Sequence, residues 1–294
     1  MVSEELFTAY SKAIDGVTTG AADAARRLTE LVAQLPPGER MDAARAGYRA
    51  LVWRYGSMAS RVALEFYQQQ RADVGVTEPY EPEEFLADTD GLTDLDVREA
   101  YAASDVAGKL ADRAARRALE SADRTIADNA IADPHHPKFA LVPRVGACAW
   151  CRFLGSKGFY YSERGMEGAR HDRCKCEVVA DHDRDDPKCW SYDPDGLQDE
   201  YRKARQAVED DARAEWDAMS SAERRAWADA HETHGRGAYD VFLRNKYLYY
   251  MESHPVDGRR TKAVSEGRGS GGGARLRHVR NGSTTTRAPQ ATRG

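Results

Sequence analysis

The sequence predicts a mainly α-helical protein with a small α+β module set between its helices, and three observations predict this fold class. Apolar residues recur every three or four positions through much of residues 1–133 and again in 193–256, which is typical of helices with one buried face. Residues 134–192 instead hold short β-prone runs, several glycines and all five cysteines. Residues 257–294 are rich in Gly, Ser, Thr and Arg, which predicts a disordered basic tail.

The N-terminal helical region, residues 1–133, shows three amphipathic stretches. The first keeps apolar residues at helical spacing until Pro36–Gly38 interrupts it (Leu6, Tyr10, Ile14, Val17, Leu28, Leu31, Val32 and Leu35). The second carries one apolar stripe (Tyr48, Val52, Tyr55, Ala59, Val62 and Phe66). The third ends at Asp133–Pro137 (Val106, Leu110, Ala114, Ala118, Ala122 and Ile126). The acidic segment Asp73–Asp96, which contains two prolines, is predicted to be a loop.

The later elements follow from the same patterns. Within 134–192 the expected strands are a run that begins at Lys138, Phe159–Tyr161 and Cys174–Ala180. A turn is predicted at Asp193–Gly196, and the next helix keeps near-ideal spacing (Tyr201, Ala204, Val208, Ala212, Trp216 and Met219). Ser220 and Glu223 form a capping-box pattern. The next stretch places a set of apolar residues on one side, and these are expected to pack against neighbouring helices (Tyr239, Phe242, Leu243, Tyr247 and Tyr250). Four aromatic residues of 193–256 are also candidates for contact with a partner (Trp216, Trp227, Tyr239 and Tyr247).

Composition limits the classes of protein. Charged residues make up 31% of the chain and the mean hydropathy is -0.71, which is typical of a polar chain with a modest core. No apolar run reaches the roughly 18 residues of a membrane span, and no apolar signal segment follows the N-terminus. We therefore expect no membrane association and a reducing compartment, where clustered cysteines bind metal or do redox chemistry more often than they form disulfides.

The net charge of -5 hides a strong asymmetry. Residues 258–294 hold nine Lys or Arg and one acid, a net of +8, so the other residues hold 34 basic and 47 acidic side chains, a net of -13. A basic flexible segment can neutralise DNA phosphates without reading sequence, although basic tails also serve only to keep a protein soluble. The candidate DNA-contacting residues are Arg259, Arg260, Lys262, Arg268, Arg275, Arg277 and Arg280.

Cysteine spacing predicts a structural zinc site. Cys148 and Cys151 form Cys-x-x-Cys, suited to a knuckle, and His171, Cys174 and Cys176 follow about twenty residues later as His-x-x-Cys-x-Cys. Tetrahedral zinc takes four N or S ligands, usually from two close pairs. Cys148, Cys151 and Cys174 are the expected ligands, with either His171 or Cys176 as the fourth. Such a centre would supply on the order of 10 kcal/mol of folding free energy to a segment too short to bury much apolar surface.

Three other readings of the cluster are weaker. A thioredoxin-like redox site uses Cys-x-x-Cys in a βαβ context and needs no second thiol cluster. Disulfides would require oxidising surroundings. A catalytic Cys–His pair would need a thiolate that metal does not hold, and no third orienting residue stands out. Glu163, Glu167 and His182 are available as bases, but their spacing does not mark them, and Cys189 is expected to be a partly buried thiol beside Trp190.

The same stretch resembles the MuF-like minor head proteins of tailed bacteriophages. "CAWCRFLGSKGFYYSERG" followed by "HDRCKC" and "EVV" is similar to their pattern, with Asp172 where proline is usual. The extended pattern of actinobacterial phages is matched at Arg144, Gly146, Cys148, Cys151, Leu154, Ser156, Gly158, Tyr161 and Glu163, with Ser162 one place out of step. The resemblance is strong over about a fifth of the chain.

The resemblance implies a virion protein that sits inside the head at the portal vertex and occupies the host cytoplasm during assembly. Its implied partners are the portal protein, the major capsid or scaffold proteins and phage DNA, and its implied role is in head assembly and in DNA packaging or ejection. Genes of this type are often labelled capsid maturation protease, which is the alternative function. The residues do not favour an enzyme, because neither Ser156–Lys157 nor Ser162, Asp172 and His182 form a recognisable catalytic pattern.

Overall fold

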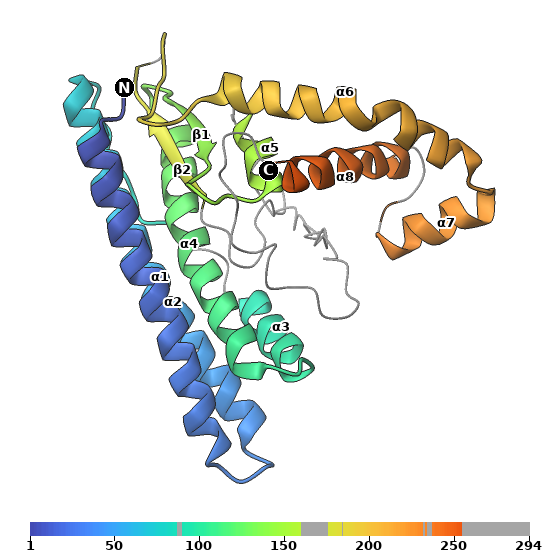
Figure 1. Cartoon of the computed structure of the whole chain (residues 1–294). Helices are drawn as coiled ribbons and strands as arrows, with labels where there is room; N and C mark the ends of the chain where they lie inside the picture. The colour runs from blue at the N-terminus through green and yellow to red at the C-terminus, as the bar shows by residue number, and fades with distance from the viewer. Residues whose placement is uncertain (87–89, 160–175, 184, 232, 234–236, 255–294) are drawn as a thin grey trace, which may run out of the picture.

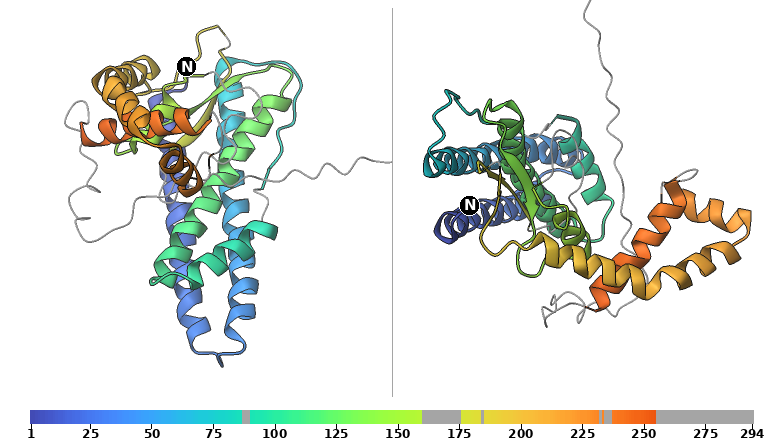
Figure 2. Two further views of the ribbon diagram at one scale, coloured as in Figure 1. Left: turned by 90° about the vertical axis from the view of Figure 1, so that its right-hand side faces the viewer. Right: turned by 90° about the horizontal axis from the view of Figure 1, so that it is seen from above.

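The computed structural model describes residues 1–86, 90–159, 176–183, 185–231, 233 and 237–254. These residues form a helical bundle, a two-stranded sheet against one end of it, and a lobe of helices that extends to the side (Figures 1 and 2). The elements in order are α1 (Glu4–Ala33), α2 (Arg40–Val74), α3 (Asp90–Tyr101), α4 (Val106–Ala132), β1 (Lys138–Val142), α5 (Ala149–Gly155), β2 (Glu177–Asp181), α6 (Pro194–Ala218), α7 (Ser221–Ala230) and α8 (Gly237–Ser253).

The bundle is formed by α1, α2 and α4, and each buries the face that its apolar spacing predicts. In Figure 1 α1 and α2 form a long antiparallel hairpin, with α4 beside both. The α4 stripe is buried from Leu110 to Ile126, and in α2 Tyr48 and Phe66 are at most 3% exposed. Leu31 is 63% exposed, however, so the apolar stripe of α1 reaches the core through Val32 instead. Small residues such as Ala59 and Ala118, both fully buried, let the helices approach closely.

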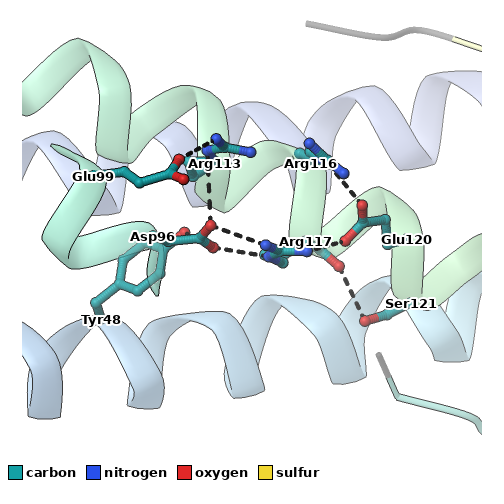
Figure 3. Close-up of polar contacts among 8 residues, drawn as sticks. All are labelled: Tyr48, Asp96, Glu99, Arg113, Arg116, Arg117, Glu120 and Ser121. Carbon is teal, nitrogen blue, oxygen red and sulfur yellow. Dashed lines mark hydrogen bonds and ion pairs between the residues drawn. The ribbon is translucent and has the colours of Figure 1, made fainter. Parts of the chain in front are cut away.

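Helix α3 corrects the predicted loop over Asp73–Asp96, because the chain is helical from Asp90. A cluster of charged side chains holds α3 on α4 (Figure 3). Arg117 donates two hydrogen bonds to Asp96, at 2.8 and 2.9 Å, and Tyr48 donates a third at 3.2 Å. Arg113 pairs with Glu99 at 2.6 Å. Among the described residues, the loop that prolines and acids predicted is limited to residues 76–86. The charged side chains of α3 are stabilised by buried arginines of α4, which the spacing of apolar residues did not reveal.

Residues 76–86, here called the strap, run in extended form beside α4. Two polar side chains of α4 each donate a hydrogen bond to the backbone of the strap and accept one from it. Asn129 donates to the Glu83 carbonyl at 2.7 Å and accepts from its N–H at 2.9 Å, and Thr125 does the same with Phe85 at 3.0 and 3.2 Å. The strap is therefore a fixed crossover, and it lets α2 and α4 run parallel.

The sheet is the antiparallel pair β1 and β2, with Lys138 opposite Asp181 and Val142 opposite Glu177. It confirms the expected strand from Lys138 and the later half of the one over Cys174–Ala180. Phe159 lies in a bend and not in a strand, and Tyr160 and Tyr161 are outside the described residues. All five residues of β2 are buried, and Gln70 of α2 donates to the Ala180 carbonyl at 2.7 Å. The sheet thus shares the core of the bundle.

Helices α6, α7 and α8 form a lobe with its own apolar cluster. Asp193 and Gly196, predicted as a turn, are the N-cap and the first turn of α6, where the Asp193 carboxylate accepts from the Gly196 N–H at 2.9 Å. The capping box of Ser220 and Glu223 is confirmed. Several aromatic residues pack inside the lobe, whereas Tyr249 is exposed: Trp216 is 9% and Tyr247 5% exposed, so these two belong to the core of the lobe. Trp227 and Tyr239 are partly buried against the same cluster.

No helix in the described part of the chain is both long enough and apolar enough to cross a membrane. The predicted tail, residues 257–294, lies outside the described residues.

Candidate metal centre

The first cysteine pair begins a helix. Gly146, with a positive φ of 84°, turns the chain after β1, and Cys148 is the N-cap of α5. Cys151 lies one turn later, so both thiols lie on the first turn of the helix. Gly158, with a φ of 68°, follows the end of α5. Two glycines of the sequence motif therefore occupy left-handed backbone positions that bracket the cysteine helix.

The third described cysteine comes from the other strand. Cys176 directly precedes β2, and the pairing of Val142 with Glu177 places it beside the segment that leads from β1 to Cys148. Cys176 is fully buried, Cys151 is 1% exposed and Cys148 is half-buried, and all three belong to the same apolar cluster. Thiol sulfur is a ligand type that suits zinc, so these three side chains have the chemistry of zinc ligands.

The remaining candidate ligands, His171 and Cys174, lie outside the described residues, as do Glu163, Glu167, Ser162 and Asp172. Among the described residues no group of three His, Cys, Asp or Glu side chains lies within reach of one ion. Three of the five candidate ligands, Cys148, Cys151 and Cys176, are among the described residues. The choice between His171 and Cys176 therefore stays as the sequence leaves it.

The residue after Cys176 anchors the junction to α1. Glu177 is 1% exposed and accepts a hydrogen bond from Ser11 at 2.5 Å and from Arg144 at 3.3 Å. Arg144 also donates twice to Asp15 of α1, both at 2.7 Å. Burial raises the pKa of Glu177 to about 7 despite these partners. Arg144 also interacts electrostatically with Cys176, and its ion pairs raise the pKa of the guanidinium.

Helix α5 connects the two apolar clusters. Cys151 packs in the cluster of the bundle, and Ala149 and Trp150 pack in the cluster of the lobe. Arg152 donates to Glu200 of α6 at 3.0 Å and to the Met251 carbonyl of α8 at 2.9 Å. The cysteine helix is therefore the joint between bundle and lobe. Spacing did not indicate the roles of Arg152 and Arg144, although both stand inside the motif.

The described residues do not assemble the catalytic alternatives. Ser156 donates to the Phe153 carbonyl at 2.7 Å, and Lys157 lies over the Phe153 ring at 4.9 Å, so the two side chains contact different groups of Phe153. His182 follows the far end of β2, about 20 Å along the strand from Cys176 at the usual rise per residue. Cys189 lies beyond it, where burial raises the pKa of its thiol and Val2 pairs with it as a bridge. It is 4% exposed, more buried than predicted.

One comparison identifies the family. The model of the family described as VG15 protein matches residues 1–204. The chain belongs to the VG15 protein family. VG15 proteins are viral proteins of phage type, so this chain is a phage protein. The VG15 match runs from α1 into α6 and includes the cysteine joint, whereas α7 and α8 lie beyond it. No curated protein and no solved structure matches the chain.

Proposed function

We propose that this protein is a minor capsid protein of a bacteriophage that acts in head morphogenesis at the portal vertex, inside the head. The observation that carries the proposal is that the VG15 match includes the Arg144–Gly158 segment, whose motif resembles that of MuF-like minor head proteins. The portal and the major capsid or scaffold proteins are its protein partners. The basic tail binds phage DNA without sequence preference.

The proposed cofactor is one structural zinc ion. Cys148, Cys151 and Cys174 would hold it, together with His171 or Cys176, with one of the five outside the first coordination sphere. A zinc ion bound by four protein ligands contributes folding free energy and leaves no position for a reacting water. Its place would be at the joint, where it would fix β2 to α5 and through α5 fix the lobe to the bundle.

Metal analysis of the purified full chain tests the cofactor. We expect one zinc per chain, with zinc lost in Cys148→Ser and retained in Cys189→Ser, because Cys189 lies at the other end of β2. An absence of zinc from the wild-type chain, together with no effect of a chelator on its folding, would rule out the centre.

Co-expression with the portal and major capsid proteins of the same phage tests the function. We expect the chain to co-purify with heads that contain portal and not with heads that lack it. Equal recovery from both would contradict the portal-vertex role. Ordered cleavage of the capsid protein that a point substitution in this chain abolishes would instead establish the alternative, a capsid maturation protease.

A further inference from the structure

A second polar site lies at the end of β2 remote from the candidate zinc ligands. His182 is 1% exposed, and among the described residues neither of its ring nitrogens has a hydrogen-bond partner. The edge of its ring contacts Tyr67 of α2, with 4.9 Å between ring centroids, and the His135 ring lies 5.8 Å away. Nε2 of His135 lies 2.8 Å from the backbone carbonyl of His182. A fully buried imidazole without a partner is an uncommon arrangement, since buried polar groups are normally hydrogen-bonded.

This site joins the ends of five segments. Asp133, at the end of α4, accepts from Tyr67 at 2.8 Å and from the backbone N–H of His135 at 2.8 Å, and it pairs closely with Arg71. Arg71 also donates to the Glu78 carbonyl at 2.5 Å, which ties the start of the strap to α2. The charged and titratable groups that face His182 or its direct neighbours are Tyr67 and Arg71 of α2, Glu78 and Tyr80 of the strap, Asp133, His135, and Asp181 of β2.

A proton on His182 would be unfavourable in this surrounding. The two oxygens of Asp133 already accept from Arg71, Tyr67 and the His135 backbone, so they have little capacity left for an imidazolium. The guanidinium of Arg71 adds positive charge nearby. Opening the contact between β2 and α2 would hydrate the imidazolium and separate it from Arg71.

We propose that His182 is an acid-responsive latch: when its ring takes up a proton, β2 and the strap release from the ends of α2 and α4. The bond that opens is the one from Gln70 to the Ala180 carbonyl, together with the Arg71 contacts of the strap. The proposal concerns the bundle end of the sheet and does not depend on the metal or on the place of the protein in the virion.

The pH range follows from the direction of the pKa shift. Burial lowers the pKa of His182 from 6.5 to about 4 in the closed form. Because the closed form disfavours the proton, its stabilisation is complete above pH 6.5 and is lost as the pH falls from about 6.5 to about 4. Between pH 7.5 and pH 5 the opening equilibrium should rise roughly 30-fold, if the open form titrates normally.

Amide hydrogen exchange of the full chain tests the latch. After correction for intrinsic rates, we expect protection of β2 and of the strap to fall by roughly 30-fold from pH 7.5 to pH 5, with α6 as an unaffected reference. His182→Phe keeps an aromatic ring without a titrating nitrogen and should abolish the change. His254→Gln, at the exposed end of α8, should leave it as in the wild type.

Two results would overturn the proposal. One is wild-type protection of β2 that does not change with pH, and the other is an equal change in His182→Phe. If His182→Phe does not fold, the histidine ring signals of the wild type decide by NMR. A His182 ring that titrates near pH 6.5 while β2 stays protected would exclude the latch, and a ring that stays neutral until β2 opens would support it.

Discussion

At the scale of single residues, the bundle holds a cluster of charged side chains in which three arginines face three acids. Arg113, Arg116 and Arg117 of α4 face Asp96, Glu99 and Glu120 (Figure 3). Arg117 and Asp96 are 5% and 1% exposed at the side chain. Removing one member of such a pair leaves the opposite charge buried, which costs more than the pair contributes while intact. Asp96 is therefore a position where substitution should be severe.

Asp96→Ala should destabilise the bundle by about 3–5 kcal/mol, because Arg117 loses two hydrogen bonds and keeps its charge in the core. Urea unfolding followed by circular dichroism measures the change. Asp94→Ala is the matched control, since Asp94 pairs with Arg49 at 3.6 Å on the surface and should contribute little. Equal losses in the two variants would show that the cluster carries no special stability.

At the scale of elements, spacing predicted the buried faces of α2 and α4 because they are regular amphipathic helices. Spacing could not predict α3, because α3 packs against arginines of α4, and charged residues are normally expected on the solvent-exposed face of a helix. Nor could it predict that Asp193 caps a helix, since Asp and Gly three residues apart are typical of turns as well as of N-caps.

The cysteine pair illustrates the same limit. Two thiols three residues apart predicted a metal ligand pair, but the element that bears them depends on contacts with distant segments. Helix α5 is short, and its place is fixed by α6, α8 and the chain after β1. Sequence therefore predicted the candidate residues of the joint and not its position between two apolar clusters, because that position depends on tertiary packing.

Gly155→Ala should loosen the α5 joint. A Cβ at residue 155 would lie 2.3 Å from Cγ of Pro143 and 3.2 Å from Cδ1 of Leu197, and a proline ring cannot move aside. Overpacking of this kind costs about 1–3 kcal/mol. Thermal unfolding should show a lower midpoint, together with a changed tryptophan signal from Trp150. Gly16→Ala is the control, because a Cβ there meets nothing within 4 Å and should stabilise α1 slightly. A midpoint unchanged by Gly155→Ala would mean that α5 is not tightly held.

At the scale of the whole molecule, the chain has two parts of opposite charge. One part holds the two apolar clusters that α5 joins, and the other is the segment 258–294. The bundle and lobe have many acidic side chains, and several of them pair with arginine within one helix or between neighbours, such as Glu209 with Arg205 at 2.6 Å. Residues 258–294 carry a net of +8 and would be attracted to DNA, from which the rest of the chain, at -13, would be repelled. DNA binding should therefore reside in the tail alone.

Removal of residues 257–294 should abolish DNA binding and leave the unfolding midpoint unchanged. For the full chain, the logarithm of the binding constant should fall linearly with the logarithm of salt concentration. If the seven named cations each displace a counterion, the slope should be about -6, from roughly 0.9 per phosphate contact. Fluorescence anisotropy with two duplexes of unrelated sequence measures the slope and should give the same affinity for both. A chain in which the seven are changed to Ser separates charge from length. Retained binding in that variant, or a slope near zero, would place the DNA contact elsewhere in the chain.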